Sequence, residues 1–245
     1  MTNKPDQPLD HPHAGRPHRV YLALTNHCNR RCPWCSTCST PEGSTHFDAA
    51  RLDAVLPDGD APFELQLEGG EPTTHPDFWS IVNSARARPR CARLVLCTNG
   101  VVLPHARPRL DQWLGRLGAP LTLKLSVNHH LLDEDPGLIA LAVAARDVLR
   151  DLGGDRLLVI NVRLRRGVED NDARVRRGVE EAGLLPHANV FFLQRYGFAA
   201  DEADWEAPFL AGHNFRLVNP DGALFTPSDA GDVLVVRSEA MRVLP

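Results

Sequence analysis

Short apolar segments alternate with amphipathic ones along the chain from about residue 19 onward. The apolar segments are rich in Val, Ile and Leu and end in turn residues, which predicts buried strands. Between them, apolar residues recur every three or four positions, which predicts helices. The expected strands are Val20–Thr25, Glu64–Glu68, Arg93–Thr98, Leu121–Val127, Leu157–Leu164 and Ala188–Leu193, and the expected helices are Asp48–Leu56, Pro76–Arg88, Arg107–Leu117, Gly137–Leu152 and Asn171–Ala182.

This regular order of strand and helix indicates an α/β fold with parallel strands and crossover helices. Right-handed crossovers curl such a sheet into a partial (β/α)6 barrel of the TIM type, with functional loops at the carboxyl ends of the strands. We expect residues 1–18 to form a flexible N-terminal arm and residues 19–200 to form the barrel. Residues 201–245 are expected to pack on the barrel as a C-terminal hairpin segment, because Asp221-Gly222 is a hairpin turn signal.

Charge and hydropathy narrow the partners and the compartment. The 245 residues include 27 basic and 31 acidic side chains, well mixed, for a net charge of −4. This balance gives no electrostatic case for nucleic acid or an anionic membrane. No apolar run approaches the roughly 18 residues that span a bilayer, and the polar start has no signal-peptide core. We therefore expect a cytoplasmic protein with no membrane partner.

Six cysteines are best treated as thiols, because a reducing cytosol does not maintain disulfides. Cys28, Cys32, Cys35 and Cys38 fall within eleven residues just after the first expected strand, which is typical of a ligand loop. Three thiolates at the first three positions can bind three irons of a 4Fe-4S cluster and leave the fourth iron open. The alternative is a structural zinc site with Cys38 as the fourth ligand, although no distant second ligand pair is evident.

Three motifs together resemble the radical S-adenosylmethionine (SAM) superfamily. They are the cysteine loop Cys28–Cys35 with Trp34 before its last cysteine, the motif Glu68-Gly69-Gly70-Glu71-Pro72 after the second strand, and Thr98-Asn99-Gly100 after the third. The resemblance covers roughly residues 19–195. It implies a 4Fe-4S cluster on Cys28, Cys32 and Cys35, and cleavage of SAM to a radical that abstracts hydrogen from a polar substrate. It also implies an external one-electron donor of the flavodoxin or ferredoxin type.

The resemblance further assigns residues to the second cofactor. Gly69 and Gly70 would let the backbone approach the methionyl group, and Glu71 would accept a hydrogen bond from its ammonium. Trp34 would lie near the adenine, and two residues of the fourth strand would hold the ribose or the carboxylate. The residues assigned to SAM are Trp34, Gly69, Gly70, Glu71, Pro72, Ser126 and Asn128.

Polar side chains alternate along the fourth and fifth strands, on the face opposite the apolar residues. A barrel interior built only for packing is apolar, so these residues indicate a lumen that receives a polar substrate, and cations among them suit an anionic group. In the alternative interpretation, Arg163 and Arg165 reach solvent or internal acids such as Glu68. Gln194 and Arg195, at the end of the sixth expected strand, are also expected to lie at the mouth of the barrel. The candidate substrate residues are therefore Lys124, Asn161, Arg163, Arg165, Gln194 and Arg195.

The sequence leaves the reaction open, because function depends on loops carried by a shared fold. No cysteine follows Cys97, so the resemblance is to a single-cluster member without a cysteine-rich C-terminal extension. Cys38 is expected to be a spare thiol near the cluster. Two alternatives remain: a glycyl-radical-type activator of a partner protein, and a non-enzymatic zinc or iron–sulfur regulator.

Overall fold

The structure is a computed structural model that describes residues 17–165, 167, 169–207, 214–226 and 233–242. Its strands are β1 (His18–Thr25), β2 (Phe63–Gly69), β3 (Cys91–Thr98), β4 (Leu121–Val127), β5 (Arg156–Leu164), β6 (Ala188–Phe192), β7 (Phe215–Val218) and β8 (Leu224–Phe225). Its α-helices are α1 (Leu52–Val55), α2 (Phe78–Arg86), α3 (Arg107–Arg116), α4 (His129–Glu134), α5 (Leu138–Leu152), α6 (Glu169–Glu181) and α7 (Val233–Ala240). Short 3-10 turns include η2 (Pro72–Thr74) and η4 (Gly197–Ala199).

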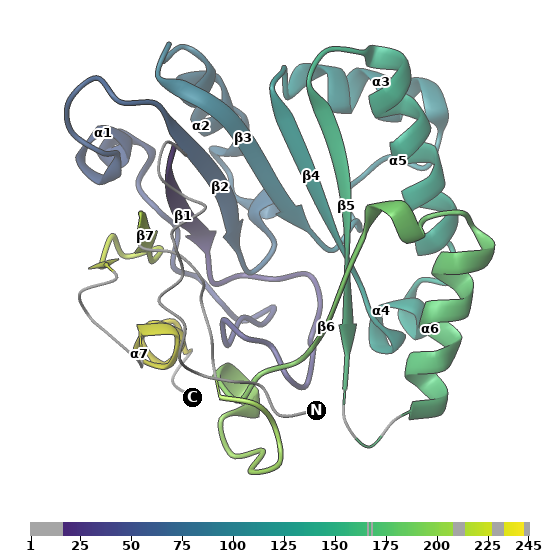
Figure 1. Ribbon diagram of the computed structural model, residues 1–245. Coiled ribbons are helices and arrows are strands. Elements are labelled where there is room, and N and C mark those ends of the chain that lie inside the picture. Colours follow the sequence, from purple (N-terminus) through teal and green to yellow (C-terminus); the bar gives the residue numbers. More distant parts are fainter. Residues whose placement is uncertain (1–16, 166, 168, 208–213, 227–232, 243–245) are drawn as a thin grey trace, which may run out of the picture.

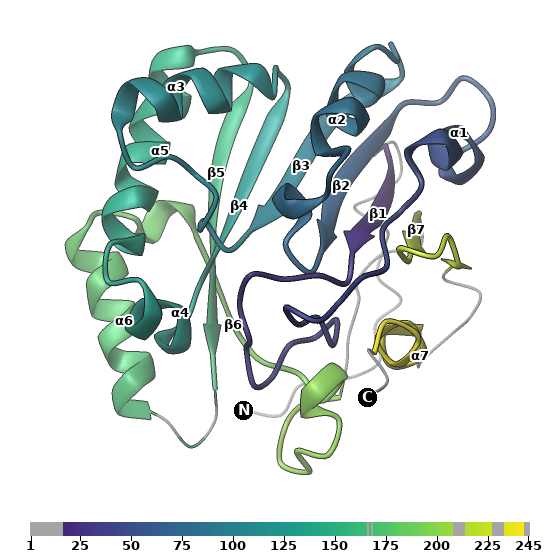
Figure 2. The same cartoon turned by 180° about the vertical axis from the view of Figure 1, so that it is seen from behind.

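The strands form one sheet in the order β6-β5-β4-β3-β2-β1-β7-β8. Neighbouring strands from β6 to β7 are parallel, and β8 runs antiparallel to β7. Figures 1 and 2 show α2, α3, α5 and α6 along one face of the curved sheet, which leaves the other face open. This is the expected α/β partial barrel, and the carboxyl ends of β1 to β6 meet at one rim.

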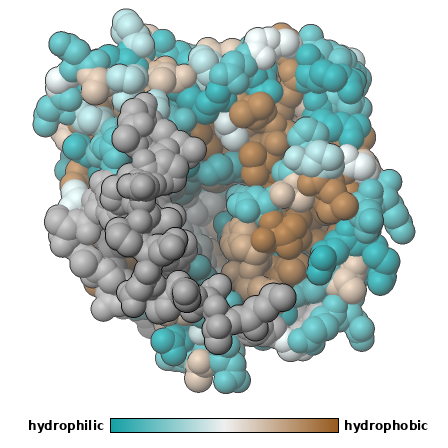
Figure 3. All heavy atoms as spheres, viewed as in Figure 1, coloured by the Kyte–Doolittle hydropathy of each residue, from teal (hydrophilic) through white to brown (hydrophobic). Residues whose placement is uncertain are grey.

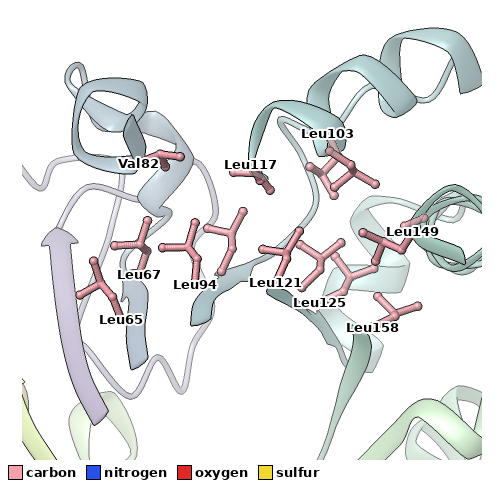
Figure 4. Close-up of a cluster of buried hydrophobic side chains, with 14 of the residues drawn as sticks. Leu65, Leu67, Val82, Leu94, Leu103, Leu117, Leu121, Leu125, Leu149 and Leu158 are labelled. Atoms are coloured by element: carbon pink, nitrogen blue, oxygen red, sulfur yellow. The ribbon is translucent and has the colours of Figure 1, made fainter. Parts of the chain in front are cut away.

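The main core lies between the sheet and the helices that cover it. Period-2 alternation places Leu123, Leu125 and Val127 of β4 under the helices, and all three are fully buried. Figure 4 shows leucines of β2, β3, β4 and β5 packed together with residues from the covering helices and loops. The polar residues of these strands therefore project to the opposite face, which α2, α3, α5 and α6 leave uncovered.

The expected strands and helices are confirmed to within about two residues, apart from the first expected helix, which is a 3-10 turn followed by the four-residue α1. The hairpin around Asp221-Gly222 is confirmed as β7 and β8, and Gly222 has the positive φ of +88° that such a turn needs. Instead of covering one end of the sheet, β7 extends its edge beside β1.

Two helices were not expected, α4 and α7. Helix α4 has six residues, too few for a helical period to show, and begins at the side chain of Asn128, which accepts a hydrogen bond from the Leu131 amide at 2.9 Å. Most of the predicted N-terminal arm lies outside the described residues. Within the described part of the chain, no helix has the length and apolarity that crossing a membrane requires.

Candidate functional site

A cavity of about 490 Å³ opens at the carboxyl ends of the strands. Figure 3 shows a hollow in the open face of the molecule, with apolar side chains on one side of it. Its wall contains twelve of the sixteen residues predicted for the site, namely Cys28, Cys32, Trp34, Cys35, Gly69, Gly70, Lys124, Ser126, Asn128, Asn161, Arg163 and Gln194. The four that do not line it are Glu71, Pro72, Arg165 and Arg195.

The loop after β1 carries the three expected cluster ligands to this wall. Backbone hydrogen bonds shape it: the Cys28 amide donates to Thr40 at 3.0 Å, and the Cys35 amide donates to the Cys32 carbonyl at 3.2 Å. Two sulfurs accept hydrogen bonds. Cys28 Sγ receives the Asn99 amide side chain at 3.7 Å, and Cys35 Sγ receives the Ser39 backbone amide at 3.4 Å. Such donors tune the potential of thiolate-bound clusters.

Burial makes the free thiols of Cys28 and Cys32 reluctant to ionise. Burial, with the negative charge of Cys35 nearby, raises the pKa of Cys28 and of Cys32 to about 12. A positively charged metal centre reverses that effect, because it stabilises thiolates directly. Three thiols on one cavity wall, two with hydrogen-bond donors at sulfur, therefore fit a 4Fe-4S cluster.

Among the described residues, no group of three or more Cys, His, Asp or Glu side chains is placed to hold a single metal ion. A zinc site needs sulfurs that converge on one ion about 2.3 Å from each. Ligands of a cubic cluster each bind a different iron, so they need not converge in that way. The geometry gives no support to the zinc alternative.

Gly69 and Gly70 pack closely against the end of β1 and the residues that follow it. A Cβ on Gly69 would lie 2.5 Å from the Thr25 carbonyl oxygen, and one on Gly70 would lie 2.0 Å from that of His27. The Gly70 amide donates to Thr25 at 2.7 Å, and the Glu71 amide donates to His27 at 2.9 Å. The glycines therefore let β2 dock against the start of the cysteine loop while their backbone lines the cavity.

Glu71 lies behind the cavity wall and does not line the cavity. Its side chain is fully buried, and the carboxylate accepts hydrogen bonds from the Thr73 hydroxyl at 2.6 Å, the Thr98 hydroxyl at 2.8 Å and the Asn99 amide at 2.8 Å. Burial raises the pKa of Glu71 against the opposing effect of these donors. The carboxylate thus joins the loops after β2 and β3, and Pro72 begins the buried turn η2 behind it.

The cavity floor carries a continuous polar chain. Lys124 Nζ donates to the Gln66 side chain at 2.8 Å, and Gln66 donates in turn to Glu68. Glu68 Oε1 lies 2.7 Å from Arg237 of α7. The Glu68 carboxylate is therefore paired with an arginine, and Lys124 donates its hydrogen bond to a neutral amide.

The two candidate arginines at the end of β5 lie in different places. Arg163 lines the cavity beside Phe191, whose ring centroid lies 5.8 Å from the guanidinium carbon. Arg165 lies outside the cavity lining, with its guanidinium carbon 5.2 Å from the ring of Trp34 and 5.9 Å from that of Trp205. The alternation along β5 placed both on one face, but the strand ends at Leu164, so Arg165 leaves the register.

Two further cysteines take different positions. Cys97 lines the cavity, and burial raises the pKa of its thiol to about 12, although Lys124 opposes the shift. Cys38 is fully buried with a positive φ of +50° and does not line the cavity. Its amide donates to Cys35 at 3.3 Å, so it closes the turn behind the third ligand.

Other cavity residues were not predicted from the sequence. Gln66 carried a signal, since it alternates with Glu64 and Glu68 along β2 and so shares their face of the strand. Arg237, Ser238 and Met241 carried none, because they belong to the C-terminal segment far from every motif. Helix α7 brings them to the cavity beside β1 and β7 (Figure 1).

Comparison with known proteins decides the family. The chain is 30% identical over 199 residues to the AdoMet-dependent heme synthase of Methanosarcina barkeri, which covers 78% of this chain and 55% of that protein. It is 31% identical over 213 residues to the GTP 3',8-cyclase of Acidothermus cellulolyticus, covering 79% and 55%. The chain belongs to the radical SAM superfamily.

Solved structures agree with this family at the level of the fold. SuiB of Streptococcus suis superimposes with a TM-score of 0.54 at 12% identity, over 85% of this chain and 60% of that one. The AdoMet- and peptide-bound anSMEcpe gives a TM-score of 0.50 at 15% identity, over 73% and 51%. No protein-family model matches the chain. The chain spans about half the length of the two curated relatives described above.

Membership of the radical SAM superfamily implies a 4Fe-4S cluster and SAM as cofactors. The cavity holds the residues that the family motifs assign to both, apart from Glu71 and Pro72.

Proposed function

We propose that this chain is a radical SAM enzyme that acts on a polar substrate with an anionic group. Cys28, Cys32 and Cys35 would hold the cluster, and Gly69, Gly70, Trp34, Ser126 and Asn128 would surround SAM. When bound, these cofactors supply the 5'-deoxyadenosyl radical, after an external donor of the flavodoxin or ferredoxin type provides one electron. The observation that carries the proposal is that one cavity gathers the three thiols, the two glycines and the polar residues of β4 and β5.

The charge of the cavity supports the anionic substrate. Lys124 and Arg163 line it, and in the described part of the chain neither forms an ion pair with a carboxylate. Glu68, the acid on the same floor, is already paired with Arg237. Two uncompensated cations in a partly closed cavity favour a ligand carboxylate or phosphate. One relative is named a GTP 3',8-cyclase, and GTP carries an anionic triphosphate.

Two neighbouring asparagine side chains supply hydrogen-bonding groups in this part of the cavity wall. Asn161 of β5 pairs in register with Asn189 of β6, and both side chains line the cavity. Each offers donors and an acceptor, so they can distinguish polar groups by position. We infer that β4, β5 and β6 hold the substrate opposite the cysteine loop.

The test is anaerobic reconstitution of the full chain with iron and sulfide, followed by reduction and addition of SAM. Release of 5'-deoxyadenosine and an electron paramagnetic resonance signal that changes on SAM addition are expected. Cys28→Ala, Cys32→Ala and Cys35→Ala should abolish both, and Cys38→Ala is the matched control with near-parental iron. Loss of iron in Cys38→Ala as complete as in the others would refute the three-ligand assignment. If the parent protein binds iron but never cleaves SAM, the proposed enzymatic function is refuted.

A further inference from the structure

The turn after β6 makes close backbone contacts with the cysteine loop. Gly197 begins the 3-10 turn η4 with φ +68°. A Cβ there would lie 2.3 Å from the Cys35 carbonyl oxygen and 2.7 Å from Ser36 Cα. Backbone atoms cannot move aside as a flexible side chain can, so only glycine fits between the two segments.

The carbonyl that Gly197 faces is a structural junction. Cys35 O accepts the Phe198 amide at 3.0 Å and the Cys38 amide at 3.3 Å. The first bond ties the loop to the turn, and the second closes the loop's own turn. Displacing this carbonyl therefore changes the peptide that orients the Cys35 side chain.

The turn is also held by residues of the C-terminal segment. The Gly197 amide donates to Ser238 Oγ at 3.3 Å, and Arg242 donates to the Gly197 carbonyl at 3.3 Å. Next to it, Trp34 packs with Leu193, Ala199 and Trp205 in a small apolar cluster separate from the main core. A side chain at position 197 cannot push the turn away without breaking these contacts, so the strain passes to the cysteine loop.

We infer that Gly197 is a positioning residue for the iron–sulfur site, and that the turn at residues 196–199 fixes Cys35 at the cavity wall. This inference rests on the proposed function, because it concerns a ligand of the proposed cluster. It also explains how the C-terminal segment bears on the site: α7 and the residues after it support the turn, which in turn supports Cys35. None of the family motifs includes this turn.

The test compares Gly197→Ala with Gly59→Ala. Gly59 has nearly the same positive φ, +71°, but nothing lies within 4 Å of its added Cβ. Both variants place Ala at nearly the same positive φ, so the main difference between them is the contact of the added Cβ with Cys35 and Ser36. We expect Gly197→Ala to bind iron about 10-fold or more weakly on reconstitution, as loss of supporting contacts around metal ligands does. Gly59→Ala should match the parent in iron content and cluster spectrum.

A second readout needs no cluster. In the apo-protein, amide hydrogen exchange over residues 32–38 should rise about 10-fold or more in Gly197→Ala and stay parental in Gly59→Ala. Parental exchange and parental iron affinity in folded Gly197→Ala would overturn the inference. If Gly197→Ala does not fold, the double variant Ser238→Ala/Arg242→Ala removes two hydrogen bonds to Gly197. It should show the same two effects to a smaller degree. Their absence in that variant would also overturn it. A parent that exchanges as expected but binds no iron would refute the proposed function instead.

Discussion

Arg237 of α7 and Glu68 of β2 form an ion pair across the cavity wall, with 2.7 Å between Nη2 and Oε1. Their side chains are only 7% and 16% exposed. Arg237 also donates to the Asn219 side chain at 3.1 Å, which fixes the guanidinium in place. A residue of the C-terminal helix thus neutralises the acid that directly precedes the Gly69-Gly70 turn.

Removing one partner of this pair should destabilise the fold. Arg237→Ala leaves the Glu68 carboxylate buried without its cation, which typically costs about 3–5 kcal/mol. The double variant Glu68→Gln/Arg237→Ala should lose less than the two single variants combined. Urea denaturation measures all three. Arg150→Ala is the control, because that arginine is 68% exposed and its loss should cost about 0.5 kcal/mol or less. Additive losses would show that the pair does not couple.

Arg163 and Arg165 should differ in function, because only Arg163 lines the cavity. Arg163→Ala removes a cavity cation, so binding of an anionic probe should weaken by about 10-fold. Arg165→Ala should leave probe binding unchanged and alter the emission of Trp34 and Trp205, whose rings it covers. Titration calorimetry with inorganic pyrophosphate measures the first effect. Equal effects of the two variants on binding, or no binding by the parent, would contradict the assignment.

Glu71 should give the protein a pH-dependent stability of opposite sign to that of an acid whose pKa is lowered by a salt bridge. Its pKa is raised in the folded state, so the folded protein retains the proton longer than the unfolded chain does. The contribution of Glu71 to stability is then full below the unfolded pKa and falls as pH rises through the folded pKa. Relative to Glu71→Gln, the parent should lose unfolding free energy as pH rises above about 4.5. Parallel curves for parent and variant would show that the pKa is unshifted.

Three thiols, of which one is buried and two are half-buried, should resist alkylation in the folded apo-protein. Burial raises the pKa of Cys28, Cys32 and Cys97 to about 12, so at about pH 8 the reactive thiolate is about 10³-fold scarcer than for a thiol of pKa 9. Mass spectrometry after brief iodoacetamide treatment should find these sites nearly unmodified, and modified once urea unfolds the chain. Rapid labelling of Cys97 in the folded protein would contradict its burial.

The order of strands and helices was readable from the sequence, because each strand of a covered parallel sheet needs an apolar run and each crossover helix needs an apolar stripe. The cysteine loop and the Gly69-Gly70 turn were readable for a similar reason. Each is a contiguous segment at a strand end, so the local pattern alone predicts that these segments share one rim of the sheet.

The local pattern could not determine where individual side chains end up. Alternation predicted one face for Arg163 and Arg165, but β5 ends between them, and only Arg163 reaches the cavity. The family motif assigned Glu71 to SAM, and only the folded chain shows that its carboxylate is buried against Thr98 and Asn99 at the end of β3.

The sequence by itself determined the family, the strand order along the chain and the three thiols. The tertiary structure alone decided that Arg237 reaches Glu68 and that Gly197 passes against Cys35. These contacts join segments far apart in the chain, and they depend on how the sheet curves and where α7 packs. A pattern read along the chain contains periodicity and spacing, but it does not contain the distances that this curvature sets.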